Sequence, residues 1–201
     1  MKKGIIGTIG IVGIIGIVVV VVLAIWAYSG YNGLVVKDEA VANKWAAVEA
    51  DYQRRADLIP NLVATVKGYA EHESSTLQGV TEARTKATSV QLNVEDLTEE
   101  NLKAYQQAQS EVSSALGRLI AVAESYPDLK ANENFRDLQV QLEGTENRIS
   151  VSRKEFNNAV QTYNVAVRRF PANLLASLFG FDRKAAFSAD EGAEKAPTVE
   201  F

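Results

Sequence analysis

The stretch FRDLQVQLEGTENRISVSRKEFNNAVQTYNVAVRRF, residues 135–170, decides the fold, because one apolar stripe runs through it at steps of three and four residues. The stripe consists of Phe135, Leu138, Leu142, Thr145, Ile149, Ser152, Phe156, Val160, Tyr163, Val167 and Phe170. This spacing places the side chains on one face of an α-helix. The helix would be ~54 Å long at about 1.5 Å per residue, and Pro171 ends it. A stripe of this length, with charged residues on either side of it, is typical of a coiled-coil-like bundle.

Three further helical stretches precede this one. The first carries a stripe at heptad spacing, made up of Leu34, Val41, Trp45, Val48, Tyr52 and Ile59. The second is predicted over 61–88 and the third up to 126, with a loop at 89–96 between them. We expect Asp96 and Glu99 to form the capping pair that opens the third stretch, and Pro127 to stop it. Short loops between long helices favour antiparallel neighbours. The sequence therefore predicts an all-α fold with an antiparallel four-helix bundle.

Pro60 interrupts the heptad pattern. Because proline lacks an amide hydrogen and disfavours helix at the residue before it, we expect a kink or tight reversal over 57–61, with Pro60 near the first turn of the next helix. Arg55 falls on the apolar step beside it, where a charge must pair or snorkel. Two interpretations stay open: a network that fixes helix register, and a partner-docking surface with exposed apolar Leu58 and Ile59. The candidate residues for docking or for a structural turn are Arg54, Arg55, Asp57, Leu58, Ile59, Pro60 and Asn61.

A second stretch, GIIGTIGIVGIIGIVVVVVLAIWA at residues 4–27, predicts a membrane anchor, since Thr8 is its one polar side chain. Roughly 24 residues are enough to cross the ~30 Å hydrocarbon core as a helix. Trp26 and Tyr28 stand where an aromatic belt would meet the interface. A cleaved signal peptide is the alternative, but its apolar region would be only ~7–15 residues long. Lys2 and Lys3 precede the span, so the positive-inside rule places the N-terminus in the cytoplasm and the bundle outside it.

Glycines recur at every third residue of the anchor. They are Gly4, Gly7, Gly10, Gly13 and Gly16. A period of three winds around a helix and does not form the single stripe of a dimer motif. The repeat is either a tolerated bias toward small residues or a means of close packing against several neighbouring helices. Gly30 and Gly33 follow the anchor and predict a flexible joint, because glycine weakens a helix interior by about 1 kcal/mol relative to alanine.

The C-terminal part begins with the short apolar segment PANLLASLFGF at residues 171–181. We expect it to pack back onto the bundle, the alternatives being a membrane surface or a neighbouring subunit. The chain therefore divides into an anchor at 1–30, a bundle at 31–170, a short apolar or amphipathic segment at 171–187 and a disordered tail at 188–201.

Residues that carry chemistry are scarce. The chain has no cysteine and one histidine, His72, so a thiolate metal site and a paired-histidine zinc motif are excluded. It has no G-x-S-x-G elbow, and no basic cluster of the kind that nucleic acid requires. We therefore expect no enzymatic activity, cofactor, small-molecule substrate or nucleic-acid partner. An oxygen-ligand metal site is the remaining alternative. Its ligands would be Glu71, Glu73, Glu143 and Glu146.

Several strings resemble the LemA family closely. They are YNGLV at 31–35, RRADLIPNLVATVKGYAEHE at 54–73, Ala83-Arg84, YPDLKANENFRDLQ at 126–139, TEN at 145–147, Arg153, FNNAVQTYN at 156–164 and Phe170-Pro171. The resemblance covers residues 31–187, and the anchor matches in kind. It implies a single-pass bacterial membrane protein with a soluble four-helix domain and no established enzymatic activity.

These observations predict a membrane-anchored helical scaffold of the bacterial inner membrane. We expect it to self-associate through the anchor and the bundle. Its partners would be the lipid bilayer, further copies of the chain and a membrane protein. The alternative is an extracytoplasmic four-helix sensor or adaptor that acts through a membrane partner such as a protease.

Overall fold

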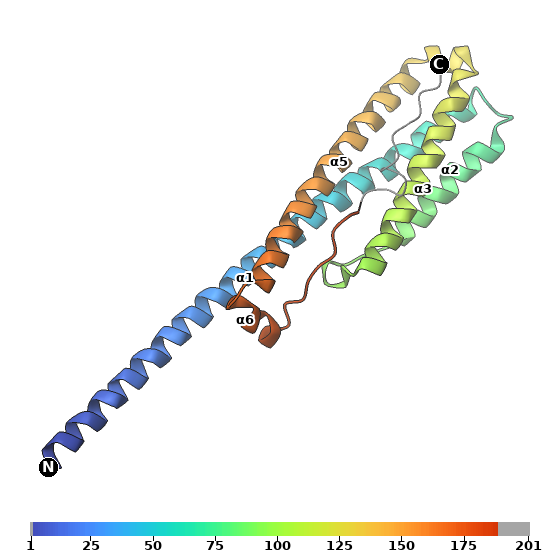
Figure 1. The fold of residues 1–201 in the computed structure, drawn as a ribbon. Coiled ribbons are helices and arrows are strands. Elements are labelled where there is room, and N and C mark those ends of the chain that lie inside the picture. Colours follow the sequence, from blue (N-terminus) through green and yellow to red (C-terminus); the bar gives the residue numbers. More distant parts are fainter. Residues whose placement is uncertain (1, 189–201) are drawn as a thin grey trace, which may run out of the picture. The chain divides into compact units, whose positions relative to one another are not determined.

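The computed structural model describes residues 2–188, with side chains from residue 13 onward, and this part is helical without any strand (Figure 1). The predicted all-α fold is confirmed. The chain forms two compact units, one of residues up to Ala40 with Thr162–Arg183, the other of Val41–Gln161 with the segment from Lys184. The elements are α1 (Lys2–Lys67), α2 (Ser74–Ser89), a 3₁₀ turn η1 (Val94–Asp96), α3 (Glu99–Glu124), α4 (Pro127–Ala131), α5 (Glu133–Arg168) and α6 (Ala172–Phe179).

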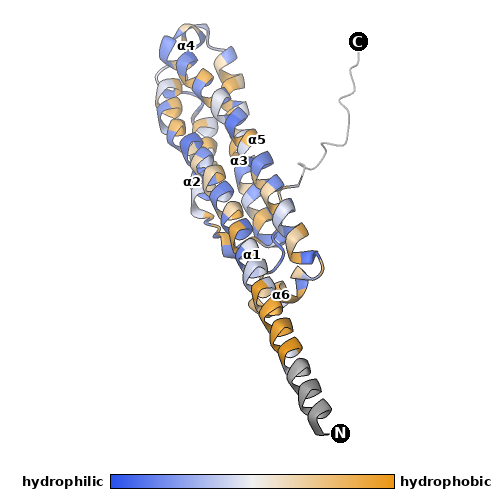
Figure 2. Cartoon of the chain, turned by 90° about the vertical axis from the view of Figure 1, so that its left-hand side faces the viewer, coloured by the Kyte–Doolittle hydropathy of each residue, from blue (hydrophilic) through white to orange (hydrophobic). Residues whose placement is uncertain are grey.

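The second unit is a four-helix bundle. It contains α1 from Val41, then α2, α3 and α5 up to Gln161, and these run alternately up and down (Figure 1). The parts of the predicted stripes that lie in this unit form its core, since Trp45, Ile59 and Phe156 are each at most 1% exposed, whereas Phe170 at the end of the last stripe is 76% exposed. Figure 2 shows the expected mixture of hydrophobic and hydrophilic residues along these helices. Each fully buried large apolar side chain contributes about 1.5–3 kcal/mol to folding, so the stripes hold the bundle together.

The reversal predicted over 57–61 is wrong. α1 continues through Pro60 to Lys67, and the chain reverses only over the turn at 68–73. A proline inside a helix costs about 3 kcal/mol or more. Ile59, Leu62 and Val66 are nevertheless all buried on one face of this last part of α1. Their burial offsets the cost of the proline, so α1 extends past it.

Arg84 supplies the hydrogen bond that Pro60 cannot make. In an α-helix the amide of residue 60 would donate to the carbonyl of residue 56, but proline has no amide hydrogen. Arg84 on α2 donates from Nε to the Ala56 carbonyl oxygen at 2.7 Å. The orphaned carbonyl is therefore satisfied from the neighbouring helix, and this contact ties α2 to α1.

Other helix boundaries also differ from the expected ones. The second stretch begins at Ser74 rather than at 61, because its first residues belong to α1. The cap of α3 is Thr98, whose side chain accepts from the Asn101 amide at 3.2 Å. Asp96 lies in η1 instead, so the Asp96–Glu99 capping pair is wrong. Pro127 is at the first turn of α4 and follows the end of α3 at Glu124.

The first unit joins the start of α1 to α6 and the end of α5. Gly30 and Gly33 both lie inside α1, so the flexible joint predicted there is wrong. Leu175 of α6 explains Gly30, because a Cβ atom on this glycine would lie 2.6 Å from Leu175 Cδ1. Tyr163 of α5 is 1% exposed. Burial, with smaller effects of the Asp38 and Asp182 carboxylates, raises the pKa of Tyr163 to about 12. Its hydroxyl therefore stays neutral at physiological pH.

A double-mutant cycle tests the role of Arg84. Arg84→Met leaves the Ala56 carbonyl unsatisfied and should lower the free energy of unfolding by about 1–3 kcal/mol. Pro60→Ala restores a backbone amide, so it should stabilise the Arg84→Met chain more than it stabilises the wild-type chain. Thermal unfolding of the full-length protein in mild detergent, followed by circular dichroism, measures both. Equal effects of Pro60→Ala in the two backgrounds would contradict the assignment.

Candidate functional site

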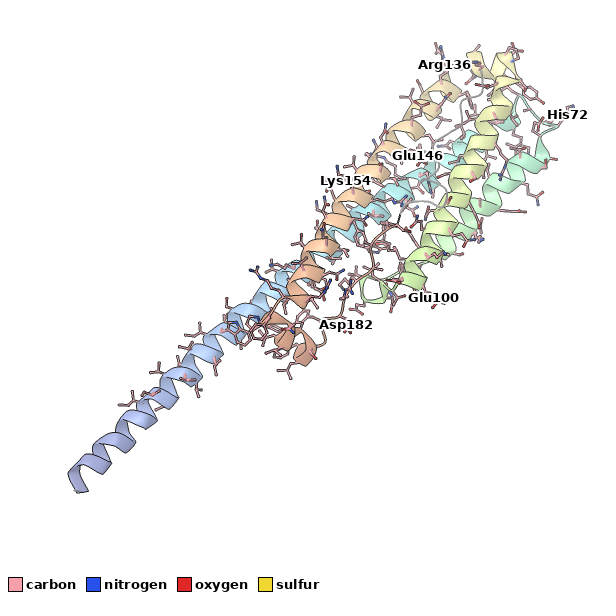
Figure 3. The ribbon with its side chains drawn as sticks, in the orientation of Figure 1. His72, Glu100, Arg136, Glu146, Lys154 and Asp182 are labelled. Atoms are coloured by element: carbon pink, nitrogen blue, oxygen red, sulfur yellow. The ribbon has the colours of Figure 1, made fainter. Side chains whose placement is uncertain are left out.

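Arg55 is the buried polar centre of the bundle, with 2% of its surface exposed. Its Nη1 donates to Ser113 Oγ at 2.7 Å and to Glu146 Oε1 at 2.9 Å. Its Nη2 donates to the backbone oxygen of Gln109 at 3.0 Å and to Gln109 Oε1 at 2.6 Å. The guanidinium also lies 5.1 Å from the ring centre of Tyr52. One side chain of α1 thus binds α3 and α5 together, with Glu146 labelled in Figure 3.

This network accounts for a charge on an apolar heptad step. Glu146 is 41% exposed in its side chain, so the pair lies at the edge of the core. Removing a buried charge from water is costly, and four hydrogen bonds to groups at fixed heights along α3 and α5 compensate. A shift of α1 by one turn would break all of them. The arrangement therefore favours the interpretation that Arg55 fixes helix register.

The other candidate docking residues are divided between core and surface. Arg54, Asp57, Pro60 and Asn61 are exposed, whereas Leu58 is half-buried. Ile59 is 1% exposed, so its predicted exposure is wrong. Because these residues belong to a continuous helix and not to a turn, they offer a polar helix face. A docking role for that face stays a prediction.

A cavity of about 170 Å³ lies beside the network. Tyr105 and Glu49 both border it, and burial raises the pKa of each side chain above its usual range. Pockets for small-molecule ligands usually measure about 300–1,000 Å³, so this one is small. Its lining comes from α1, α2, α3 and the loop before η1: Glu49, Tyr52, Gln53, Arg55, Ala56, Ile59, Arg84, Ala87, Thr88, Val90, Gln91, Tyr105, Gln109 and Val112.

Two of the acidic residues considered as metal ligands accept hydrogen bonds from other side chains. Glu146 accepts from Arg55, and Glu73 Oε1 accepts from the Tyr126 hydroxyl at 3.3 Å. Within residues 13–188 no cluster of three histidine or acidic side chains could hold a metal ion. His72 lies in the connection between α1 and α2, at the end of the bundle and apart from Glu146 in α5 (Figure 3).

A backbone clamp on Phe187 is the site that sequence reasoning missed. Asn157 of α5 donates from Nδ2 to the Phe187 carbonyl at 3.0 Å and accepts at Oδ1 from the Phe187 amide at 2.9 Å. The Ala185 amide donates to the Leu97 carbonyl at 3.0 Å. The segment after Lys184 is thus held along the bundle by its backbone. The one sequence feature that points to the clamp is an asparagine beside an apolar stripe. A solvent-facing asparagine would look the same in the sequence.

An aromatic cluster holds the Phe187 side chain. The Phe187 ring is stacked on Trp45 with centroids 6.0 Å apart, and packs edge-on against Phe156 at 5.5 Å. The Arg153 guanidinium lies 4.7 Å from its centre. Trp45 in turn donates from Nε1 to the Leu92 carbonyl at 3.0 Å. Phe187 is 7% exposed, so its ring belongs to the core of the bundle, although the packing predicted from the sequence concerned residues 171–181.

Over residues 13–25 the anchor is a helix that the described part of the chain leaves exposed. It is long and apolar enough to span a membrane, and none of its most apolar window is buried. Ile14 and Val20 are 64% and 65% exposed. Nothing lies within 4 Å of a Cβ added at Gly13 or Gly16, and Gly4, Gly7 and Gly10 also lie in α1, outside the residues whose side chains the structure describes. Trp26 is half-buried and Tyr28 is 74% exposed.

A sequence profile of the LemA family matches residues 44–201, well over half of the chain. The chain belongs to the LemA family. The match begins after the apolar span and contains both the Arg55 network and the Phe187 clamp. The resemblance noted from the sequence is therefore confirmed.

Relatives of this LemA protein include magnetosome proteins. Magnetosome protein MamQ 2 of Paramagnetospirillum magneticum is 30% identical over 169 residues, which cover 76% of this chain and 62% of the relative. Magnetosome protein MamQ of Magnetospirillum gryphiswaldense is 29% identical with the same coverage. Protein LemA of Metamycoplasma hominis is 24% identical over 160 residues, 80% of this chain and 69% of the relative. The chain thus spans less than two thirds of the length of the MamQ relatives. Family and span together indicate a membrane-associated helical protein.

Replacement of Arg55 by lysine tests the register network. Lysine keeps the charge but loses the planar fork that reaches acceptors on two helices, so Arg55→Lys should cost roughly 2–4 kcal/mol of unfolding free energy. Arg54→Lys is the matched control, because Arg54 is exposed and its replacement should change stability by no more than about 0.5 kcal/mol. Chemical denaturation of both variants gives the comparison. If both variants lowered the free energy of unfolding by the same small amount, the network would not stabilise the fold.

The clamp is tested by Asn157→Asp. Aspartate can still accept from the Phe187 amide but cannot donate to the Phe187 carbonyl, and an unmet buried bond costs about 1–3 kcal/mol. Hydrogen exchange in a peptide covering 181–188 should therefore become about 5- to 150-fold faster. Gln161→Glu, an exposed amide-to-acid change on the same helix, should leave the rate unchanged. Unchanged protection in Asn157→Asp would contradict the clamp.

Proposed function

We propose that this LemA protein is a non-enzymatic, membrane-anchored helical scaffold of the bacterial cell envelope, which self-associates through its anchor and its bundle. The apolar span carries the proposal. Residues 14–25 include ten large apolar side chains that are at least half exposed, from Val19 and Val21 at 50% to Ile17 at 66%. Such a surface requires either lipid or other helices around it.

The glycines of the span support the self-associating part of the proposal. In lipid, helices associate by van der Waals packing, and small residues let their backbones approach closely. Among the described residues, none lies within 4 Å of a Cβ added at Gly13 or Gly16. Because glycine lowers helix stability, two glycines without such a contact are better explained by contacts with other copies.

The polar sites favour a structural over a catalytic role. A catalytic group needs free capacity to bond a substrate, whereas the guanidinium of Arg55 is bonded to Ser113, Gln109 and Glu146. The cavity beside it, of about 170 Å³, is smaller than the pockets that usually hold small-molecule ligands. These observations support the view that the polar residues of the bundle position helices.

The proposed location is the inner membrane, with a cytoplasmic N-terminus and the bundle on the other side. Lys2 and Lys3 support this orientation, because the positive-inside rule counts cations close to the span in sequence. The chain has no cysteine, so a single cysteine at exposed Asp57 reports the side directly. We expect an impermeant maleimide to label Asp57→Cys in intact spheroplasts. Labelling that occurs only after lysis would show that the bundle lies on the cytoplasmic side, contrary to the proposal.

Self-association is tested by protein mass. Light scattering of the full-length chain in mild detergent should give a defined oligomer. Gly13→Leu combined with Gly16→Leu should lower its mass, because leucine side chains keep helices apart. Ile14→Leu with Ile17→Leu is the matched control, since it replaces equally exposed apolar residues, and should leave the mass unchanged. A monomeric wild-type chain would contradict self-association.

The cavity favours a second candidate, a four-helix sensor or adaptor that acts through a membrane partner such as a protease. Glu49, Arg84 and Tyr105 border it, so a small polar ligand with both hydrogen-bond donors and acceptors is the chemistry it would accept. Its volume of about 170 Å³ limits such a ligand to a small molecule. Copurification of a membrane protein with a monomeric chain would favour this candidate over the scaffold.

A further inference from the structure

Helix α6 has an apolar face that the protein leaves uncovered. Leu174 and Leu178 are 58% and 74% exposed, and they lie one turn apart on the helix. Phe170, just before α6, is 76% exposed. Leu175 and Ala176 are buried instead. α6 therefore packs with one face inside its own unit and presents a second apolar face outward.

This face lies beside the end of the apolar span. α6 rests directly on the α1 backbone, because a Cβ atom at Gly30 would meet Leu175 Cδ1 at 2.6 Å. The Tyr31 ring lies 4.9 Å from that of Phe179 and 5.7 Å from that of Phe181, between centroids. Gly30 follows Trp26 by about one turn, or ~6 Å along the helix. α6 thus lies where a bilayer crossed by the span would have its headgroups, next to the hydrophobic part of α1 in Figure 2.

Basic residues flank the helix on both sides. Arg168 and Arg169 precede Phe170, and Arg183 follows α6, all three exposed. Asp182 is the one acidic residue between 162 and 183. Lipid phosphates and anionic headgroups attract such cations. The arginines thus stand in sequence at both ends of the exposed apolar residues, and an anionic lipid surface is a partner that would suit both.

We propose that α6 is an interfacial helix, which inserts Phe170, Leu174 and Leu178 into an anionic bilayer while its flanking arginines bind lipid phosphates. The face continues the surface of the span, which is why lipid is the occupant. The exposed side of α6 also has an apolar part and a polar part, as an interfacial helix requires. Asn173 and Ser177 form the polar edge next to the leucines. The proposal rests on the span crossing a bilayer and is independent of self-association.

Spin labels on single cysteines test this in the full-length chain. The chain is placed in nanodiscs of phosphatidylcholine with phosphatidylglycerol, and the accessibility of the label to oxygen is compared with that to a water-soluble nickel complex. Leu178→Cys should favour oxygen, as should Val20→Cys in the span. Ser177→Cys, the adjacent residue on the polar edge, should favour nickel. This contrast between neighbours is the expected result.

Three outcomes would overturn the proposal. A label at Leu178 as open to nickel as the one at Ser177 would place the face in water. A nickel-accessible label at Val20 would show that neither the span nor α6 lies in lipid. Dipolar broadening at Leu178 that disappears on dilution with unlabelled chains would show that a second copy covers the face.

The proposed binding of lipid phosphates by the arginines is tested by changing the charge of the lipid. Replacing phosphatidylglycerol with phosphatidylcholine should reduce the inserted population of the Leu178 label, by about fivefold for each arginine that contacts the anionic surface. Arg168→Gln, Arg169→Gln and Arg183→Gln together should abolish this dependence on lipid charge. A dependence that survives the triple replacement would overturn the role of the arginines.

Discussion

The structure depends on α1 remaining one helix from Lys2 to Lys67. This helix supplies both the apolar span and one side of the bundle core, and three residues that follow the span oppose helix formation. Gly30 and Gly33 lower its stability, and Pro60 removes a backbone hydrogen bond. The fold meets two of these costs locally: Leu175 packs where Gly30 leaves room, and Arg84 bonds the carbonyl that Pro60 frees. Gly30 and Pro60, which look like breaks in the sequence, thus mark the contacts of α1 with α6 and α2.

Apolar burial and polar bonding have separate roles in the bundle. The heptad stripes stabilise helix packing in general, but apolar side chains tolerate a shift between helices better than hydrogen bonds do. Arg55 is bonded to Ser113, Gln109 and Glu146, so it favours the one register in which all of these bonds form. The Asn157 clamp does the same for the segment around Phe187. Polar groups that a sequence search presents as candidate chemistry therefore position helices here.

The helices and the anchor were predictable because they depend on periodicity alone. The stripe from Phe135 to Val167 and the run from 4 to 27 need only a count of apolar residues. The reversal was placed wrongly at 57–61, because the effect of Pro60 is decided by a hydrogen bond between Arg84 and Ala56, which lie 28 residues apart. The Asn157 clamp depends likewise on Phe187, 30 residues away. Local pattern gives the elements, whereas such long-range contacts decide where they end and what holds them.

An exposed apolar helix, a polar centre whose Arg55 is bonded to two neighbouring helices and membership of the LemA family together support the proposal of a scaffold whose copies meet through the span. Disulfide crosslinking in native membranes tests that claim most directly, since the chain has no cysteine of its own. Single cysteines are placed in turn at each residue from Gly13 to Ile25 and oxidised. The account predicts crosslinked dimers at positions that recur with a helical period and include Gly13 or Gly16. Crosslinks at no position would contradict it.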